Sequence, residues 1–194
     1  MKKKPKRSVA EGFSFLIAIY LYNFMRERID MIRTAVEADI PELMNIYNDA
    51  ILHTTATFDT ESKDMEERRA WFAEHTGRHI LLLYETEGCV AGYASLSRYR
   101  DRRAFDVAVE LSVYISEQYR GQGIGSRLME AILSHARDCE EIQTVISLIA
   151  SGNEASIHLH ENFGFTYCGT IRDAGIKFGK KLSLHAYQII YDRG

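Results

Sequence analysis

Arg120-Gly121-Gln122-Gly123-Ile124-Gly125 joins a predicted strand over residues 107–115 to a predicted amphipathic helix over residues 124–139. Glycines in such a turn let the backbone approach an anion closely, and free N–H groups at the start of the helix point toward it. The Arg-x-x-Gly-x-Gly spacing differs from the dinucleotide-binding and P-loop patterns. The stretch therefore predicts a phosphate-binding turn, with a plain strand-to-helix turn as the alternative.

The composition is that of an ordinary globular domain. The chain has 194 residues, of which 46% are hydrophobic and 26% charged, so it can bury a core of its own. A net charge of −3 offers no broad field for nucleic acid. The cysteines Cys89, Cys139 and Cys168 form no Cys-x-x-Cys pair, which argues against a disulfide framework and favours a reducing compartment, the cytoplasm.

The N-terminal segment differs from the rest of the chain. It is basic and contains an apolar run over residues 13–24. The run is shorter than the roughly 20 residues of a membrane span, and no small-residue cleavage site follows it. We therefore divide the chain into an extension, residues 1–30, and one domain, residues 31–194. Translation from Met31, a helical extension and a weak membrane-surface anchor remain alternatives for the extension.

Predicted strands and helices follow in the order β-α-α-β-β-β-α-β-α-β-β. Asp39 is expected to cap the first helix, and the second places Arg68 and Trp71 on one stripe. The unit over residues 105–149 should be a parallel crossover, so the fold class is α/β or α+β with a mixed sheet. Predicted strands cover residues 31–36, 79–85, 89–99, 105–115, 144–149, 165–170 and 182–191, and predicted helices cover residues 39–52, 64–75, 124–139 and 153–162.

Three features now stand in order: Glu110, the glycine turn, and the run that begins at Asn153 and ends in Phe163-Gly164-Phe165. This order resembles the GNAT family of acetyl-CoA-dependent N-acetyltransferases over residues 31–191. The chain is further similar to the phosphinothricin and methionine sulfone (sulfoximine) acetyltransferase branch. The segments that carry this second similarity are residues 46–50, 57–61, 92–95, 109–115 and 177–179.

The resemblance implies a GNAT fold with a central sheet of about seven strands and about four helices, acetyl-CoA as co-substrate, and a homodimer. Transfer to an amine also needs a base, because an amine with a pKa near 10 is protonated at neutral pH. Glu110 is the candidate base, with a solvent-facing glutamate as the alternative. His160 stands where GNAT enzymes often have a tyrosine; it is either the proton donor to the leaving thiolate or a structural histidine.

The same resemblance places the pantetheine arm along the strand that precedes the turn, and backbone N–H groups there face the developing oxyanion. Arg120 and the turn amides are expected to hold the pyrophosphate. Asn153 either contacts the cofactor or caps its helix. The expected cofactor-binding residues are Val113, Tyr114, Ile115, Arg120, Gly121, Gln122, Gly123, Ile124, Gly125, Ser126 and Asn153.

An amino-acid substrate brings a carboxylate, for which arginine is the natural partner. The resemblance favours Arg100 and Arg102 in the basic loop, with a solvated loop as the alternative. Phe58 is expected to wall an apolar slot, and Trp71 lies either in that slot or in the core. Lys181 and Ser183 stand where the branch often has tryptophan and aspartate.

No metal is expected, because the histidines of His158-x-His160 point about 200° apart on a helix. No base is placed beside a cysteine, which favours direct transfer over an acetyl-enzyme.

The sequence thus predicts a cytoplasmic acetyl-CoA-dependent N-acetyltransferase that acts on a small amino acid or analogue. The alternatives are a GNAT acting on a protein N-terminus or a polyamine, a non-catalytic acyl-CoA sensor, and a membrane-surface protein.

Overall fold

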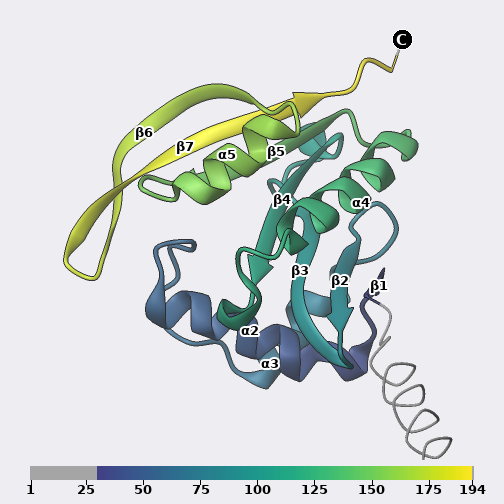
Figure 1. Ribbon diagram of the computed structural model, residues 1–194. Helices are drawn as coiled ribbons and strands as arrows, with labels where there is room; N and C mark the ends of the chain where they lie inside the picture. The colour runs from purple at the N-terminus through teal and green to yellow at the C-terminus, as the bar shows by residue number, and fades with distance from the viewer. Residues whose placement is uncertain (1–29, 194) are drawn as a thin grey trace, which may run out of the picture.

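The computed structural model describes residues 30–193. The N-terminal extension, apart from Asp30, lies outside these residues. Within them, no helix is long and apolar enough to cross a membrane. The strands are β1 (Met31–Thr34), β2 (Leu81–Thr86), β3 (Cys89–Arg98), β4 (Ala108–Ile115), β5 (Thr144–Ala150), β6 (Thr166–Lys177) and β7 (Lys180–Ile190), and the α-helices are α2 (Ile40–His53), α3 (Met65–Ala73), α4 (Ile124–Asp138) and α5 (Glu154–Asn162) (Figure 1).

The strands form one seven-stranded sheet in the order β1-β2-β3-β4-β5-β7-β6. Only β4 and β5 pair in parallel; the other pairs are antiparallel. The glycine turn and α4 make the crossover between the two parallel strands. The expected mixed sheet with four flanking helices is therefore confirmed.

The parallel pair is short, and its end opens the sheet. β4 and β5 pair at only three positions, the last joining Glu110 to Ile146. Beyond that point β4 pairs with β3 and β5 pairs with β7 (Figure 1). The backbone edges of residues 111–115 and 147–150 that face each other are consequently not joined by sheet hydrogen bonds.

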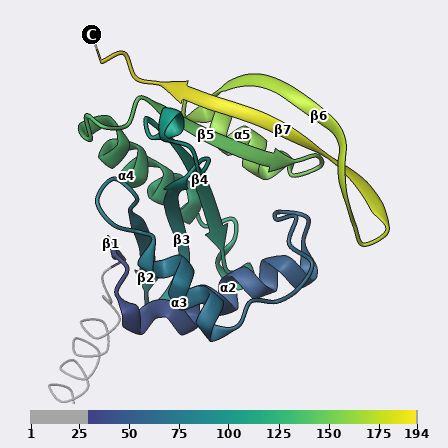
Figure 2. The ribbon, with the colours of Figure 1, turned by 180° about the vertical axis from the view of Figure 1, so that it is seen from behind.

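Two hydrophobic clusters lie on opposite faces of the sheet. Leu128 and Ile132 of α4 pack on Val109 and Leu111 of β4 in the larger one. α2 and α3 cover the other face, where Leu43 packs near Tyr93 of β3 (Figure 2). Because side chains alternate along a strand, Glu110, Ser112 and Tyr114 point to the face of α2 and α3.

The Asp39 side chain does not cap α2, contrary to expectation. Its carboxylate accepts hydrogen bonds from Arg33 (2.7 and 2.8 Å) and from the Val36 N–H (2.8 Å). Arg33 on β1, six residues earlier in the chain, therefore competes with the helix for this carboxylate, and the capping preference of aspartate does not show which partner it takes.

The last hairpin is longer than expected. β6 runs to Lys177, seven residues beyond the predicted end at Thr170, and pairs with β7 across a turn at Phe178-Gly179. The register shifts twice, after Tyr167 and after Ile171. Such bulges interrupt the two-residue alternation by which a strand is recognised. Figures 1 and 2 both show this hairpin extending beyond the rest of the sheet.

Gly92 of β3 is required by close packing. A Cβ there would lie 2.7 Å from the Tyr114 carbonyl oxygen and 2.6 Å from Ile115 Cδ1. We expect Gly92→Ala to lower the free energy of unfolding by about 1–3 kcal/mol, because β4 must shift to accept the methyl group. Urea unfolding monitored by circular dichroism measures this.

Gly125→Ala is the matched control. The nearest heavy atom to its Cβ is Leu159 Cδ2 at 3.5 Å, an ordinary contact, and the position is helical. Its stability should stay unchanged or rise by up to about 1 kcal/mol. Equal stability of Gly92→Ala and wild type would contradict the packing argument.

Candidate functional site

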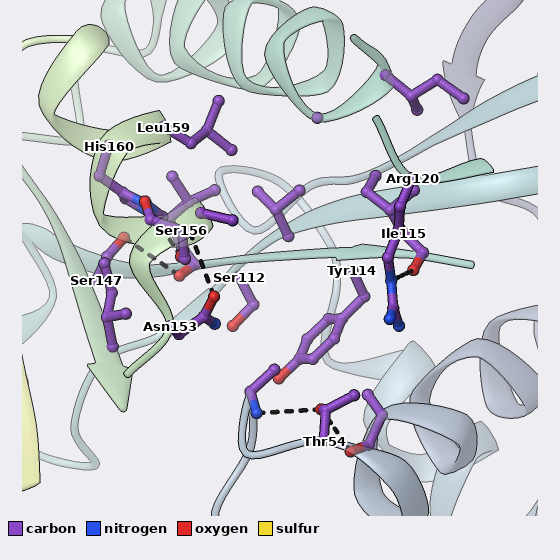
Figure 3. A pocket seen from close by; sticks show the side chains of 18 of the residues that line it. Thr54, Ser112, Tyr114, Ile115, Arg120, Ser147, Asn153, Ser156, Leu159 and His160 are labelled. Carbon is purple, nitrogen blue, oxygen red and sulfur yellow. Dashed lines mark hydrogen bonds between the residues drawn. The ribbon is translucent and has the colours of Figure 1, made fainter. Parts of the chain in front are cut away.

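A cavity of about 480 Å³ occupies the opening between β4 and β5. Its wall includes Ser112–Ile115 of β4 and Ser147–Ile149 of β5. The glycine turn, the start of α5 and the end of α2 complete it (Figure 3). Backbone groups that a closed sheet would pair with each other thus face a hollow, where a ligand can take their hydrogen bonds.

The glycine turn forms one end of this cavity. Gly121 (φ +75°) and Gly123 (φ +77°) are left-handed, and no atom lies within 4 Å of where their Cβ atoms would be. Gly123 is the N-cap of α4 and makes no side-chain cap, so the first N–H groups of a 15-residue helix have no side chain to accept them. This arrangement suits an anion.

Arg120 stands beside the turn. Its Nε donates to the Ile115 carbonyl oxygen (3.3 Å), and its Nη2 lies 3.7 Å from an Asp49 carboxylate oxygen on α2. The side chain is 45% exposed, so the ion pair is screened by water and weak. A more highly charged anion in the cavity can therefore compete with Asp49 for this guanidinium.

His160 and Arg120 lie at opposite sides of the cavity (Figure 3). His160 is buried, and its ring packs edge-on against Phe165 (4.8 Å between centroids). Nδ1 lies 2.7 Å from the Ser156 carbonyl oxygen. A carbonyl only accepts, so Nδ1 carries the hydrogen, and Nε2 of the neutral ring is an acceptor.

Nε2 of His160 is buried and has no hydrogen-bond partner within the described part of the chain. Burial lowers the pKa of the imidazole, which favours the neutral ring at physiological pH. The Asn153 side chain, at the N-cap of α5, accepts a hydrogen bond from the Ser156 N–H (3.3 Å). Asn153 therefore caps α5 and also lines the cavity.

Glu110 lies at the point where β4 and β5 separate. It pairs in register with Ser97 of β3, and its side chain is half-buried. Burial raises the pKa of this carboxyl, and the nearby Arg100 guanidinium partly opposes that effect. A carboxylate whose pKa is raised toward neutrality has the property required of a general base.

A second cavity of about 270 Å³ lies on the α2 and α3 face of the sheet. Ser112 and Tyr114 line both cavities, so the two meet at β4, on the same face and two residues beyond Glu110. The remaining lining residues are Tyr47, Asp59, Lys63, Glu67, Arg68, Trp71, Tyr93, Ser95 and Ser97.

Most residues expected to bind cofactor share one wall. The first cavity is lined by Val113, Tyr114, Ile115, Arg120, Gly121, Gly123, Ile124, Gly125, Asn153 and His160. Gln122 on the glycine turn and Ser126 in the first turn of α4 are exposed and do not line this cavity.

The residues expected to bind substrate lie outside both cavity walls. Arg100 and Arg102 are exposed, and Arg100 stacks on the Tyr99 ring (4.4 Å). Phe58 packs against Gly175 of β6, where a Cβ would lie 2.7 Å from the ring. Of the three, only Arg100 is brought close to Glu110.

The sequence did not predict that the polar side chains of the second cavity belong to a site. Ser95, Ser97 and Ser112 look like ordinary alternating polar residues of strands. Arg68 carried a usable signal, since an arginine on the apolar stripe of α3 is unusual. Trp71 packs on the second hydrophobic cluster, as the core interpretation predicts, and it also lines the second cavity.

Among residues 30–193, no group of three His, Cys, Asp or Glu side chains is placed to hold a metal ion.

Comparison with known proteins gives a consistent result. The model of the acetyltransferase (GNAT) family matches residues 41–165. The chain is 39% identical over 163 residues to an L-methionine sulfoximine/L-methionine sulfone acetyltransferase of Pseudomonas paraeruginosa, covering 83% of this chain and 94% of that protein. It is 38% identical over 161 residues to a phosphinothricin N-acetyltransferase of Streptomyces coelicolor, covering 81% and 94%.

Solved structures agree in fold. A putative acetyltransferase from Salmonella typhimurium, determined with acetyl-CoA, superimposes with a TM-score of 0.81 at 35% identity, covering 85% of this chain and 95% of that one. A GNAT superfamily phosphinothricin acetyltransferase from Sinorhizobium meliloti in complex with acetyl-CoA gives a TM-score of 0.79 at 30% identity, covering 85% and 90%.

The raised pKa of Glu110 has a consequence for stability. The carboxyl is ionised more readily in the unfolded chain, where its pKa is 4.5, than in the folded one. Its charge therefore destabilises the fold above the folded-state pKa, and this penalty vanishes below the unfolded-state pKa. We expect Glu110→Gln to melt higher than wild type at pH 7, with the difference shrinking toward pH 4.

Differential scanning calorimetry at both pH values tests this expectation. Glu130→Gln is the control, because Glu130 is exposed on α4 and its replacement should leave the melting temperature unchanged. A Glu110→Gln variant that melts below wild type at pH 7 would show that the ionised carboxylate contributes stability instead.

Proposed function

Because this chain belongs to the acetyltransferase (GNAT) family and is an N-acetyltransferase, we propose that it transfers acetyl from acetyl-CoA to a small free amino acid or analogue. The proposed acceptors are methionine sulfone, methionine sulfoximine and phosphinothricin. The observation that carries the proposal is the meeting of two cavities at Ser112 and Tyr114. Two substrates held in the two cavities would meet at Ser112, two residues from Glu110 on the same face of β4.

The first cavity fits acetyl-CoA, which supplies an activated thioester. Open space at Gly121 and Gly123, the uncapped start of α4 and the Arg120 guanidinium suit a pyrophosphate. The unpaired edge of Val113–Ile115 suits the amides of a pantetheine arm, with Asn153 at the opposite wall. Gln122 and Ser126 are proposed to contact the phosphates from the exposed side of the turn.

Glu110 is proposed as the base. It would take a proton from the acceptor ammonium, directly or through water, so that the amine lone pair can attack the thioester carbonyl. The N–H groups of the open β4 edge would stabilise the oxyanion. The carbon–nitrogen bond forms, the carbon–sulfur bond breaks, and coenzyme A leaves as a thiolate.

His160 is proposed to return a proton to the departing sulfur. Its Nδ1–H is used by the Ser156 carbonyl, so the group that acts is Nε2. Nε2 carries no proton in the neutral ring, so it would first take up the second proton, which the attacking nitrogen loses as the amide forms, and would then pass it to the sulfur. The low imidazole pKa favours rapid release of that proton. Direct transfer is preferred to an acetyl-enzyme because no cysteine lines either cavity.

Arg100 and Arg102 are proposed to attract the acceptor's acid group at the entrance, and Phe58 to contact its apolar part.

We also propose a homodimer, because the edge strand β6 exposes Tyr167, Ile171 and Ile176. Sedimentation equilibrium that finds only a monomer would contradict the homodimer.

Residues 1–30 are proposed as an extension separate from the domain. The three free cysteines favour a reducing, cytoplasmic location.

The proposed acceptor class is tested by coenzyme A release from acetyl-CoA, followed with a thiol reagent. The panel contains methionine sulfone, methionine sulfoximine, phosphinothricin, ordinary amino acids, spermidine and a short peptide. We expect turnover with the first three. Turnover confined to spermidine or the peptide would refute the acceptor class and leave the acetyl transfer.

Glu110→Gln tests the base. We expect kcat to fall about 10²–10⁴-fold with little change in acetyl-CoA affinity, because the amide cannot take a proton. In the wild type, kcat/KM should rise with pH through the raised pKa of Glu110, and the variant should lose this rise. A variant that keeps wild-type turnover from pH 6 to 9 would remove Glu110 from the mechanism.

A further inference from the structure

The second cavity contains a buried arginine that the family resemblance did not indicate. Arg68 lies on α3 and is only 4% exposed, yet it lines the cavity. Its guanidinium carbon lies 3.6 Å from the centre of the Trp71 ring and 4.9 Å from that of Tyr47. The planar cation is therefore held flat on an indole, in a fixed orientation.

The charge of Arg68 has no counter-ion within residues 30–193. Nε and Nη2 are buried and make no hydrogen bond there, and no carboxylate lies within ion-pair distance. The two acidic side chains of the cavity are otherwise engaged, since Lys63 pairs with both Asp59 (3.3 Å) and Glu67 (3.7 Å).

Burying a cation without a counter-ion lowers the free energy of unfolding, because the charge loses its hydration. The aromatic rings offset only part of that cost, so an anion in the cavity would be strongly favoured. Tyr93 does not supply one, because burial raises the pKa of its phenol and keeps it neutral, although the Arg68 charge opposes this effect.

Ser97, on the β3 wall of the cavity, presents an acceptor. His75 Nδ1 donates to the Trp71 carbonyl oxygen (2.8 Å), so its Nε2 is an acceptor in the neutral ring. The Ser97 hydroxyl, 3.0 Å away, must then donate to Nε2, which leaves the Ser97 oxygen free to accept. Ser97 stands in register with Glu110, so two acceptor groups lie together on neighbouring strands.

The cavity therefore has unpartnered donors at Arg68 and an acceptor at Ser97, and Glu110 lies next to Ser97 on the neighbouring strand without lining the cavity. A molecule with an ammonium group and an oxygen-rich acidic group matches this polarity. A simple amine or a polyamine does not, because it would leave the guanidinium uncompensated and add a second cation beside it.

We propose that Arg68 binds an oxyanion group of the acceptor and makes the enzyme selective for amino acids over simple amines. This inference rests on the proposed function and assigns the specificity of that same site. The shared chemistry is an oxygen-rich group that takes guanidinium hydrogen bonds. In methionine sulfone the anionic group is the carboxylate, because the sulfone oxygens carry no net charge.

The test compares wild type, Arg68→Met and the control Arg69→Met, which changes the exposed neighbour on the same helix. Three acceptors are used: methionine sulfone, its carboxamide, which lacks the carboxylate, and methionine, which lacks the sulfone oxygens. Loss of a charge-assisted hydrogen bond is worth about 10–100-fold in kcat/KM. Melting temperature and the KM for acetyl-CoA are measured in parallel.

We expect wild type and Arg69→Met to prefer methionine sulfone over its carboxamide by about 10–100-fold. In Arg68→Met that preference should collapse to a few-fold, through a higher KM for the sulfone at unchanged KM for acetyl-CoA. A collapse against the carboxamide assigns Arg68 to the carboxylate. A collapse against methionine alone would place Arg68 at the uncharged sulfone oxygens and would overturn the oxyanion assignment.

Arg68→Lys retains the charge and serves if Arg68→Met does not fold; it should show the same collapse, smaller in size, because lysine lacks the planar fork. Unchanged ratios in a folded variant would overturn the inference and leave Arg68 a structural residue on Trp71. If the wild type acetylates no amino acid, the proposed function fails first. Turnover by the wild type with only a simple amine would then refute the Arg68 inference as well.

Discussion

The early end of the β4–β5 pair is the constraint on which the rest of this structure depends. Three parallel residue pairs join the strands, and beyond Glu110 each strand has a partner on one side only. Unpaired backbone groups are costly inside a protein unless something bonds to them. The fold therefore carries a polar slot through its sheet, and the glycine turn, α5 and the end of α2 close around it.

Burial around the slot and around the second cavity shifts the pKa of some polar side chains and leaves others without hydrogen-bond partners. Glu110 stands where the strands part, where burial raises its pKa, and Ser112, two residues further along β4, lines both cavities. His160 and Arg68 are each buried with nitrogens that no described residue satisfies. Unsatisfied groups of this kind lower the stability of the free protein, and they are tolerated where a ligand completes them.

Local sequence predicted the elements well where the pattern was regular. α4 and β4 begin and end within three residues of expectation, because their apolar periods are unbroken. The errors came from contacts that an apolar period does not describe. Arg33, six residues before Asp39, takes the carboxylate that was expected to cap α2, and two bulges interrupt the pairing of β6 with β7. The pattern of apolar residues shows neither which partner a carboxylate takes nor where the register of a strand shifts.

The sequence by itself determined the glycine turn, the α/β order and the positions of Glu110 and His160, because each depends on spacing along the chain. Tertiary structure alone decided what those side chains can do. The Ser156 carbonyl selects the His160 tautomer, and the separation of β4 from β5 determines how far Glu110 is buried. Arg68 became significant only in the folded chain, since whether a charge has a counter-ion depends on neighbours brought together by packing.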